Sequence, residues 1–239
     1  MYSNTGIYSL PSASRLVGVP APKIRRWLFG HTHKRKTDDG VVKTHAVPLW
    51  SPQLSKDDYE AEVIGFLDLL EIRFVAAFVA HGVPLQVVRT CLETARTLLN
   101  TDHPFASGSF KTDGKTIFAE ALSQSAKEGA LLDLKERQFA FKDIIKPSLY
   151  QGIEHNSGHE AVRWYPSKTE PVVVLDPTRQ FGSPIIEASG VPTDVLFKSF
   201  QAEGATPQAM AATAGTYGVS LKHAEAAVRF EQNLRQKSH

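Results

Sequence analysis

Two short apolar stripes, one on each side of Gly18, are the feature that most constrains the fold of this 239-residue chain. Both have the i, i+3, i+4 spacing that places side chains on one face of a helix. Ser9 can cap the first helix, and Pro22 is tolerated in the first turn of the second. Two short helices joined by a glycine-containing turn are the pattern of a helix-turn-helix unit, which we predict here. The stripes consist of Ala13, Leu16 and Val17, and of Ile24, Trp27 and Leu28.

Positive charge is concentrated in this same part of the chain. The net charge of the whole chain is +2, but residues 1–50 carry eight Lys or Arg against two Asp or Glu. A basic block of this kind is often only a solvated face. On the second helix, however, the cations lie largely off the apolar stripe, where a recognition helix makes its phosphate and base contacts. We therefore predict that this segment binds DNA through Arg15, Lys23, Arg25 and Arg26.

A basic hairpin, or wing, is predicted directly after the second helix. Asp38-Asp39-Gly40 is a turn signal, and an extended stretch follows it from Val41 to Leu49. Cations on such a wing can follow the phosphate backbone of DNA. His31 and His33 have no cysteine or carboxylate nearby at metal-ligand spacing, so we interpret them as polar loop residues. The wing adds four predicted DNA contacts, namely His33, Lys34, Arg35 and Lys36.

Three stretches carry a family resemblance: Tyr8-Ser9-Leu10 through Arg26-Trp27, the basic wing, and residues 81–88 (HGVPLQVV). Together they resemble the MerR-type winged helix-turn-helix, which has a second helical pair. The first helix of that pair is expected to start near Ser55, whose spacing to Asp58 is a capping signature. The second helix is expected from about Leu85. No long coiled coil with a cysteine-based sensor follows, so the resemblance does not imply a metal- or drug-sensing activator.

The middle of the chain, residues 106–170, is expected to be a mixed α/β segment. Asp113-Gly114 is a two-residue hairpin signal between two short runs with strand character. A helix is expected over residues 120–128. Beyond it, residues 137–165 mix aromatic residues with glycine and proline, and the sequence assigns no regular element there.

Signals for catalysis and metal binding are weak. His155 and His159 are four residues apart, as in zinc proteases, but Asn156 stands where that chemistry needs a glutamate. We interpret this segment as a polar loop. Cys91 lies in an amphipathic helical pattern, where a buried and unreactive thiol is the usual case. We therefore predict a protein without catalytic activity and without a cofactor or bound metal. A hydrolase that uses His155 and His159 is the weakest alternative.

The C-terminal region predicts a short buried strand followed by three helices. The strand covers residues 172–175 and is closed by Asp176-Pro177. The helices are expected to begin near Thr193, after a Thr206 cap and after a Ser220 cap. The alanine-rich surface of the last two helices suits close helix packing, either in the core or between two copies of the chain.

Several motifs at fixed spacing lie within this region: Asp176-Pro177, Phe181-Gly182-x-Pro184, Val191-Pro192-Thr193, Gly204-Ala205-Thr206-Pro207, Tyr217-Gly218-Val219 and Ala227-Val228-Arg229-Phe230. Together they resemble a small domain of VapB-type antitoxins, whose larger members join it to a MerR-like N-terminus. The resemblance implies an antitoxin that neutralises a PIN-type ribonuclease toxin by direct binding and represses its own operon. A PIN nuclease holds metal ions with carboxylates, which arginine side chains could bind instead. The candidates for toxin binding are Arg163, Arg179, Arg229 and Arg235.

These observations predict a mainly α-helical fold with small β elements: a MerR-like winged helix-turn-helix and a C-terminal three-helix module. The expected domains are residues 1–105, 106–170 and 171–239. The expected partners are operator DNA and the cognate toxin, and a homodimer is expected on a palindromic site. The sequence has no run of apolar residues long enough for a membrane span, and its single cysteine fits a cytoplasmic protein. The main alternative is a stand-alone MerR-like regulator that responds to a small ligand.

Overall fold

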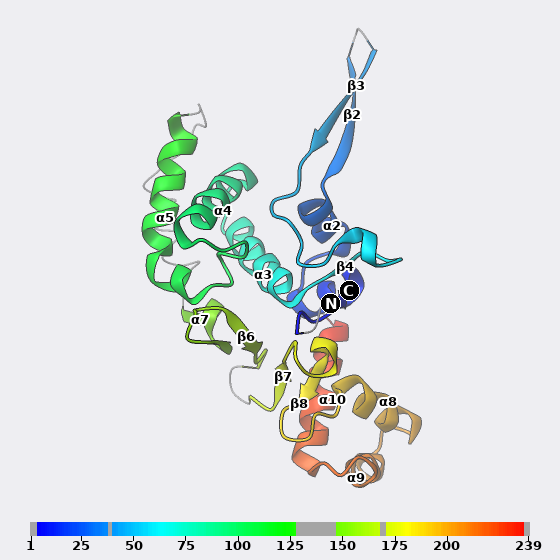
Figure 1. Ribbon diagram of the computed structural model, residues 1–239. Coiled ribbons are helices and arrows are strands. Elements are labelled where there is room, and N and C mark those ends of the chain that lie inside the picture. Colours follow the sequence, from blue (N-terminus) through cyan, green and yellow to red (C-terminus); the bar gives the residue numbers. More distant parts are fainter. Residues whose placement is uncertain (1–3, 38–39, 128–146, 168–170, 237–239) are drawn as a thin grey trace.

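The computed structural model of the chain describes residues 4–37, 40–127, 147–167 and 171–236. Side chains are described for all of these except residues 33–37, 40–44, 56, 125–127 and 147–148. Helices predominate in the described part, and three small antiparallel sheets accompany them (Figure 1). The predicted fold class is therefore confirmed. Among the described helices, none has the length and apolar composition that a membrane span requires.

The N-terminal helices form as the sequence predicts. After strand β1 (Tyr8–Ser9), helix α1 (Leu10–Val17) begins with the Ser9 hydroxyl accepting the backbone N–H of Ser12 at 3.3 Å. Gly18 follows with a left-handed φ of +72°, which glycine adopts without steric cost. Helix α2 (Ala21–Phe29) then packs against α1. The two predicted apolar stripes are buried between them, apart from the partly exposed Val17.

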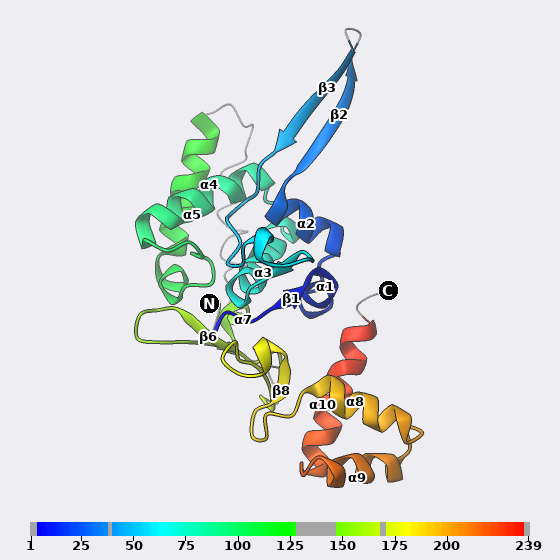
Figure 2. The same cartoon turned by 45° about the vertical axis from the view of Figure 1, so that its right-hand side comes forward.

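The wing is a long two-stranded hairpin that projects away from the body of the protein (Figures 1 and 2). It consists of β2 (His31–Thr37) and β3 (Gly40–Ala46), paired in unbroken antiparallel register from His31 opposite Ala46 onward. Gly30 begins the wing at a φ of +69°, and a Cβ there would collide with the carbonyl oxygen of Ala46. The predicted turn is only partly described, because residues 38 and 39 lie outside the described residues.

The second helical pair consists of α3 (Phe66–Ala80) and α4 (Leu85–Leu99). The predicted start of its first helix near Ser55 was wrong. Ser55 does cap, but it caps a single 3-10 turn, η1 (Lys56–Asp58), and strand β4 (Val63–Ile64) follows, paired with β1. Helix α3 begins only at Phe66, because the buried carboxylate of Asp68 accepts the backbone N–H of Gly65 at 2.9 Å.

The hairpin predicted around Asp113-Gly114 was also wrong, since both residues lie inside helix α5 (Gly108–Lys127). One face of α5 buries large side chains against the core, and this helical periodicity outweighs the local turn signal of the dipeptide. The Phe110 ring lies over Gly114, where a Cβ would come within 2.9 Å of it. The buried residues of α5 are Phe110, Ile117, Phe118, Ala121 and Leu122. The helix predicted over 120–128 is the end of α5, as far as it is described.

A four-stranded antiparallel sheet follows the short helix α7 (Pro147–Tyr150). Its strands lie in the order of the chain, and the predicted strand at 172–175 is confirmed as β7. Strands β6 and β7 pair across the predicted domain boundary at residue 170, so residues on both sides of it share one sheet. The division into three domains stays a prediction. The strands are β5 (Ile153–His155), β6 (Ala161–Trp164), β7 (Val173–Leu175) and β8 (Pro184–Ile186).

The three predicted C-terminal helices are confirmed, and they pack together at one end of the molecule (Figure 2). They are α8 (Thr193–Ala202), α9 (Pro207–Thr216) and α10 (Leu221–Gln236). The predicted caps also form. The Thr206 hydroxyl accepts the N–H of Ala209 at 3.1 Å, and the Ser220 hydroxyl accepts that of His223 at 3.2 Å.

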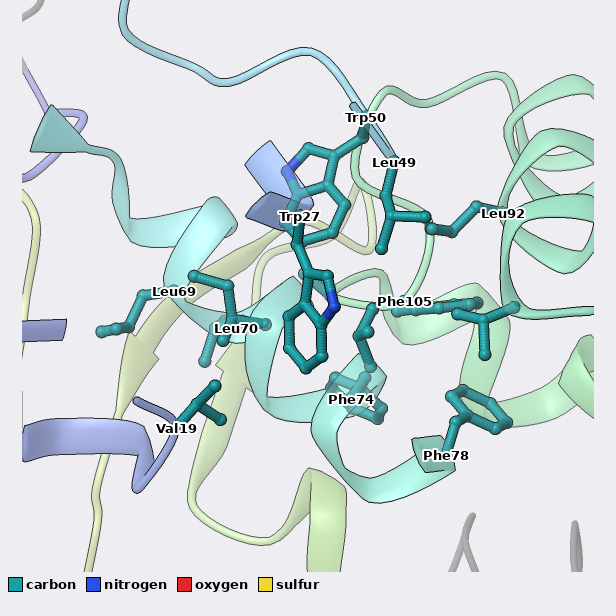
Figure 3. Close-up of a cluster of buried hydrophobic side chains, with 14 of the residues drawn as sticks. Val19, Trp27, Leu49, Trp50, Leu69, Leu70, Phe74, Phe78, Leu92 and Phe105 are labelled. Atoms are coloured by element: carbon teal, nitrogen blue, oxygen red, sulfur yellow. The ribbon is translucent and has the colours of Figure 1, made fainter. Parts of the chain in front are cut away.

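One large core joins the helix-turn-helix to the second helical pair and to α5. The centroid of the Phe105 ring lies 6.4 Å from that of Phe74 and 5.2 Å from that of Phe78, and Trp27 belongs to the same core (Figure 3). Trp50 completes one side and donates its indole N–H to the Asp68 carboxylate at 2.8 Å. The winged helix-turn-helix and the second helical pair therefore share one packed core.

Candidate nucleic-acid interface

Helix α2 presents cations on the face opposite to its buried stripe. The side chains of Arg25 and Arg26 are exposed, and Lys23 is half-buried, with its ammonium 5.1 Å from the centroid of the Trp27 ring. The Arg26 Nε donates to the carbonyl oxygen of Pro22, at 3.3 Å, within the same helix. Arg15 is exposed on α1. These four predicted DNA-binding residues therefore lie on the surface of the helix-turn-helix, as a DNA contact requires.

Arg25 has an acidic partner within the chain. Its Nε lies 2.8 Å from a carboxylate oxygen of Glu62, and the two side chains are 52% and 21% exposed. The hydrogen bond with Glu62 raises the pKa of the Arg25 guanidinium. An exposed ion pair of this kind contributes little to stability, so a DNA phosphate or base can take the place of Glu62 at small cost. The pair with Glu62 thus orients the Arg25 side chain on the surface of α2.

The wing carries a row of cations on its two strands. Lys34 stands opposite Lys43 in the register of β2 and β3. The side chains of His33, Lys34, Arg35 and Lys36 lie outside the described part, so their contacts stay a prediction.

Arg89 on α4 fixes the base of the wing, and sequence reasoning missed it. Its guanidinium donates to two successive carbonyl oxygens, that of Pro48 at 2.7 Å and that of Val47 at 3.0 Å. Next to them, the N–H of Leu49 donates to the carbonyl oxygen of Trp27 on α2 at 2.7 Å. The segment that leaves the wing is therefore attached to both α2 and α4. No local sequence signal could have revealed Arg89, because its partners lie 41 and 42 residues away.

A groove of about 380 Å³ runs between α2, the base of the wing and α4. Its lining is largely apolar, but Lys23, Arg26 and Arg89 contribute three cations to it. This arrangement places α2 and the wing base on one continuous basic surface. The lining residues are Lys23, Arg26, Trp27, His31, Ala46, Val47, Leu49, Leu85 and Arg89.

A buried polar cluster lies on α3. The Asp68 carboxylate accepts the Trp50 indole N–H and the backbone N–H of Gln53 and Gly65 at 2.8–3.0 Å, and burial raises its pKa. Glu71 accepts the N–H of Ala106 at 3.1 Å, and complete burial raises its pKa well above the ordinary range. These carboxyl groups join α3 to the loops on either side of it. They are inaccessible to DNA and serve to position the helices.

The arginines predicted to bind a toxin fall into two groups. Arg163 and Arg179 lie at the sheet. The Arg163 Nε donates to the Asp176 carboxylate at 3.0 Å, and Arg179 donates to the carbonyl oxygen of Glu187 at 3.0 Å. Although burial opposes ionisation of Asp176, its bonds from Thr178 and Arg163 lower its pKa.

The other two toxin-binding candidates lie on α10. Arg229 is exposed, and the guanidinium of Arg235 lies 4.2 Å from the centroid of the Phe197 ring on α8. Arg235 thereby covers part of the helical module, whereas Arg163 and Arg179 order the sheet. The four candidates are therefore divided between the sheet and α10.

The residues considered for catalysis take part in the packing and turns of the fold. The imidazole of His155 lies 3.0 Å from the carbonyl oxygen of Ala106, and partial burial lowers its pKa. His159 lies in the turn after β5, at a φ of +63°. Within the described ranges, no group of three or more potential ligands gathers to hold a metal ion. Cys91 is fully buried in α4, as predicted, and burial raises the pKa of its thiol.

A basic recognition helix, a basic wing and a second helical pair on one core define a winged helix-turn-helix protein. Residues 6–92 match a family described as "Putative DNA-binding HTH domain". Over 221 residues, the chain is 27% identical to a Mycobacterium tuberculosis (strain ATCC 25618 / H37Rv) protein named "Putative antitoxin VapB45", covering 90% of this chain and 89% of that protein. The predicted resemblance to VapB-type antitoxins is thereby confirmed.

The fold also has a counterpart among solved structures. The crystal structure of Rv2018 from Mycobacterium tuberculosis matches with a TM-score of 0.66 at 24% sequence identity. The match covers 95% of this chain and 100% of that one, so the fold is shared along nearly the whole length of both.

Proposed function

We propose that this protein is the DNA-binding antitoxin of a toxin–antitoxin pair, acting by binding and not by catalysis. The observation that carries the proposal is the basic surface of α2 and the wing. It occurs in a chain related over 90% of its length to a protein named as an antitoxin. The protein would neutralise a PIN-type ribonuclease toxin and repress its own operon.

The part of the proposal that concerns DNA assigns base and phosphate contacts to different elements. Arg25 and Arg26 on α2 would enter the major groove, because the exposed face of a recognition helix reads base edges there. The wing cations would neutralise backbone phosphates, which adds affinity without sequence preference. A homodimer would place two α2 helices about 34–36 Å apart on a palindromic operator.

The part of the proposal that concerns the toxin assigns its neutralisation to the sheet and the C-terminal helices. Arg163, Arg179, Arg229 and Arg235 are the proposed donors to the carboxylates of a PIN nuclease. The Arg163 side chain is 43% exposed although its Nε is bonded to Asp176. A terminal nitrogen lies 3.9 Å from the exposed Glu154 carboxylate, with which a toxin carboxylate would compete. Bidentate pairs between arginine and carboxylate are among the stronger polar contacts available at an interface.

Co-expression with the product of the adjacent gene tests the proposal. Affinity capture should yield a stable complex, and the captured complex should have suppressed ribonuclease activity. The same complex, or the protein alone, should bind DNA from its own promoter in a fluorescence anisotropy assay. A folded protein that captures no toxin but binds its promoter would reject the antitoxin role and retain the regulator.

A second candidate function is a regulator that responds to a small polar ligand. A cavity of about 170 Å³ between the α4–α5 loop and the turn after β5 favours it. His159, a non-glycine residue at a φ of +63°, lines this cavity, and strained backbone often marks ligand clamps. Polar groups from His103, Ser107 and Glu160 complete it. A neighbouring gene that encodes no nuclease, together with ligand-induced thermal stabilisation of the protein, would favour this alternative.

A further inference from the structure

Phe181 is the most exposed of the large hydrophobic side chains in the described part of the chain, with 75% of its surface accessible. It lies in the 3-10 turn η2 (Gln180–Gly182), between β7 and β8. Single exposed hydrophobic residues are common on protein surfaces and need no explanation by themselves. At Phe181, however, the backbone conformation holds the side chain in its exposed position.

Three successive residues of this turn adopt left-handed backbone conformations. Their φ angles are +47° at Gln180, +53° at Phe181 and +80° at Gly182. Residues with a Cβ rarely adopt this region, and such strain persists only where the surrounding structure imposes it. The turn therefore stores conformational strain at the residue that displays an exposed aromatic ring.

Contacts from the N-terminal strand impose this conformation. The N–H of Ile7 donates to the carbonyl oxygen of Phe181 at 2.9 Å, and the buried Tyr8 hydroxyl donates to that of Gly182 at 2.7 Å. A Cβ on Gly182 would collide with the Tyr8 hydroxyl, so only glycine fits. The Phe181 ring is consequently presented by a rigid turn and would lose little conformational entropy on binding.

A hollow of about 330 Å³ lies directly beside the ring. Its walls include Asn4, Ile7, Pro177 and Thr178, together with Phe181 itself, and none of the residues that line it is charged. An aromatic side chain and a hollow able to receive one thus belong to the same patch of surface.

We propose that Phe181 is the anchor of a symmetric homodimer, in which each ring enters the hollow of the other copy. A two-fold interface brings the same patch of both copies together, so it must be self-complementary. A protruding ring beside a hollow meets this requirement, and an uncharged patch does not repel its own copy. The inference rests on the homodimer of the proposed function and names its surface.

Substitution of Phe181 by aspartate tests the inference. Asp adopts left-handed backbone conformations more readily than most residues, so the turn should persist in Phe181→Asp. Two copies would bring two carboxylates together in an apolar site. We expect the wild type to be dimeric at 50 µM in light scattering coupled to gel filtration, and Phe181→Asp to be monomeric. The matched control is Leu98→Asp on α4, where the original side chain is 59% exposed, and this variant should stay dimeric.

Disulfide crosslinking provides a second measurement that leaves Phe181 in place. Cys91 is fully buried, so a cysteine introduced at the rim of the hollow is the one accessible thiol among the described residues. Thr178→Cys should form a covalent dimer under mild oxidation. Gln208→Cys on the exposed, alanine-rich face of α9 should not.

A monomeric wild type would overturn the inference. So would a dimeric Phe181→Asp, or crosslinking at residue 208 in place of residue 178. A Phe181→Asp protein that stays dimeric but no longer captures toxin would assign Phe181 to the toxin interface instead. Binding of a single half-site should survive in monomeric Phe181→Asp. Failure of the wild type to bind DNA would reject the proposed function while leaving the dimer intact.

Discussion

The two ends of the chain use their basic residues in different ways. On α2, Lys23 lies over the Trp27 ring and Arg26 donates to Pro22, both within the same helix, and Arg25 shares an exposed pair with Glu62. In the C-terminal part, Arg163 holds the nearly buried Asp176, and Arg179 ties the turn after β7 to β8. The arginine residues at the two ends of the chain therefore have different roles. Positive charge remains available to a partner at the N-terminal end, whereas much of it stabilises the fold at the other.

The largest effect is expected from the wing. Replacing Lys34, Arg35 and Lys36 by alanine removes three proposed phosphate contacts. This should lower operator affinity on the order of 10²–10³-fold near 0.1 M salt and reduce the salt-dependence slope by about 2.7. Fluorescence anisotropy titrations at several salt concentrations measure both quantities. The control, Lys111→Ala with Lys115→Ala on the exposed face of α5, should change neither. An unchanged slope in the wing variant would remove the wing from the interface.

Arg89 should give the next largest effect. If it holds the wing base, Arg89→Ala releases several wing cations at once, and the salt slope should fall by clearly more than the value of about 0.9 expected for one lost phosphate contact. Affinity should fall about 10- to 100-fold. Arg96, seven residues further along α4 and paired with the exposed Asp102, is the matched control. A fall of about 0.9 would instead make Arg89 a direct phosphate contact.

Whether a feature depends on nearby or on distant residues explains what the sequence could and could not predict. The helix-turn-helix and the wing follow from local spacing, and so do the Thr206 and Ser220 caps, because each depends on residues within a few positions. Arg89 depends on carbonyl groups 41 and 42 residues away, which no local pattern encodes. The Asp113-Gly114 turn signal was misleading because burial of one face of α5 outweighs it. The Ser55 capping signature was genuine, but it serves a single turn.

The internal role of Arg163 predicts an effect on stability instead of DNA affinity. Arg163→Ala leaves Asp176, which is 1% exposed, without its cation and should lower the free energy of unfolding by about 1–3 kcal/mol at pH 7. The Asp176 pKa is depressed in the folded protein, so this stabilisation exists above its unfolded pKa and is lost as the pH falls. The difference between wild type and variant should therefore shrink towards pH 3 in urea unfolding.

Arg15→Ala should give the opposite result. Arg15 is exposed on α1, so its loss should weaken DNA binding with little effect on unfolding. If Arg163→Ala weakened DNA binding without a change in stability, the division between the two ends of the chain would be wrong.

The smallest effect is expected from Glu71, a buried carboxyl group whose surroundings differ from those of Asp176. Asp176 has an arginine partner and a lowered pKa. The hydrogen-bond donors to Glu71 are instead backbone N–H groups at residues 105–106, its second oxygen has no hydrogen-bond partner among the described residues, and burial raises its pKa. A raised pKa means that the folded protein binds the proton more tightly than the unfolded chain. The stabilisation from Glu71 is therefore fully present below the unfolded pKa, near 4.5, and is lost as the pH rises through the folded pKa. The sign is opposite to that of Asp176.

Glu71→Gln should remove this dependence. The glutamine carbonyl can still accept the N–H of Ala106, and the neutral amide cannot ionise inside the core. We expect the variant to gain on the order of 1 kcal/mol at neutral pH and to lose the decline that the wild type shows as the pH rises from 4 to 8. Urea unfolding across that range measures it. A variant that keeps the wild-type decline would assign the decline to Asp68, whose raised pKa acts in the same direction. Asp68→Asn would then be the substitution that flattens the curve.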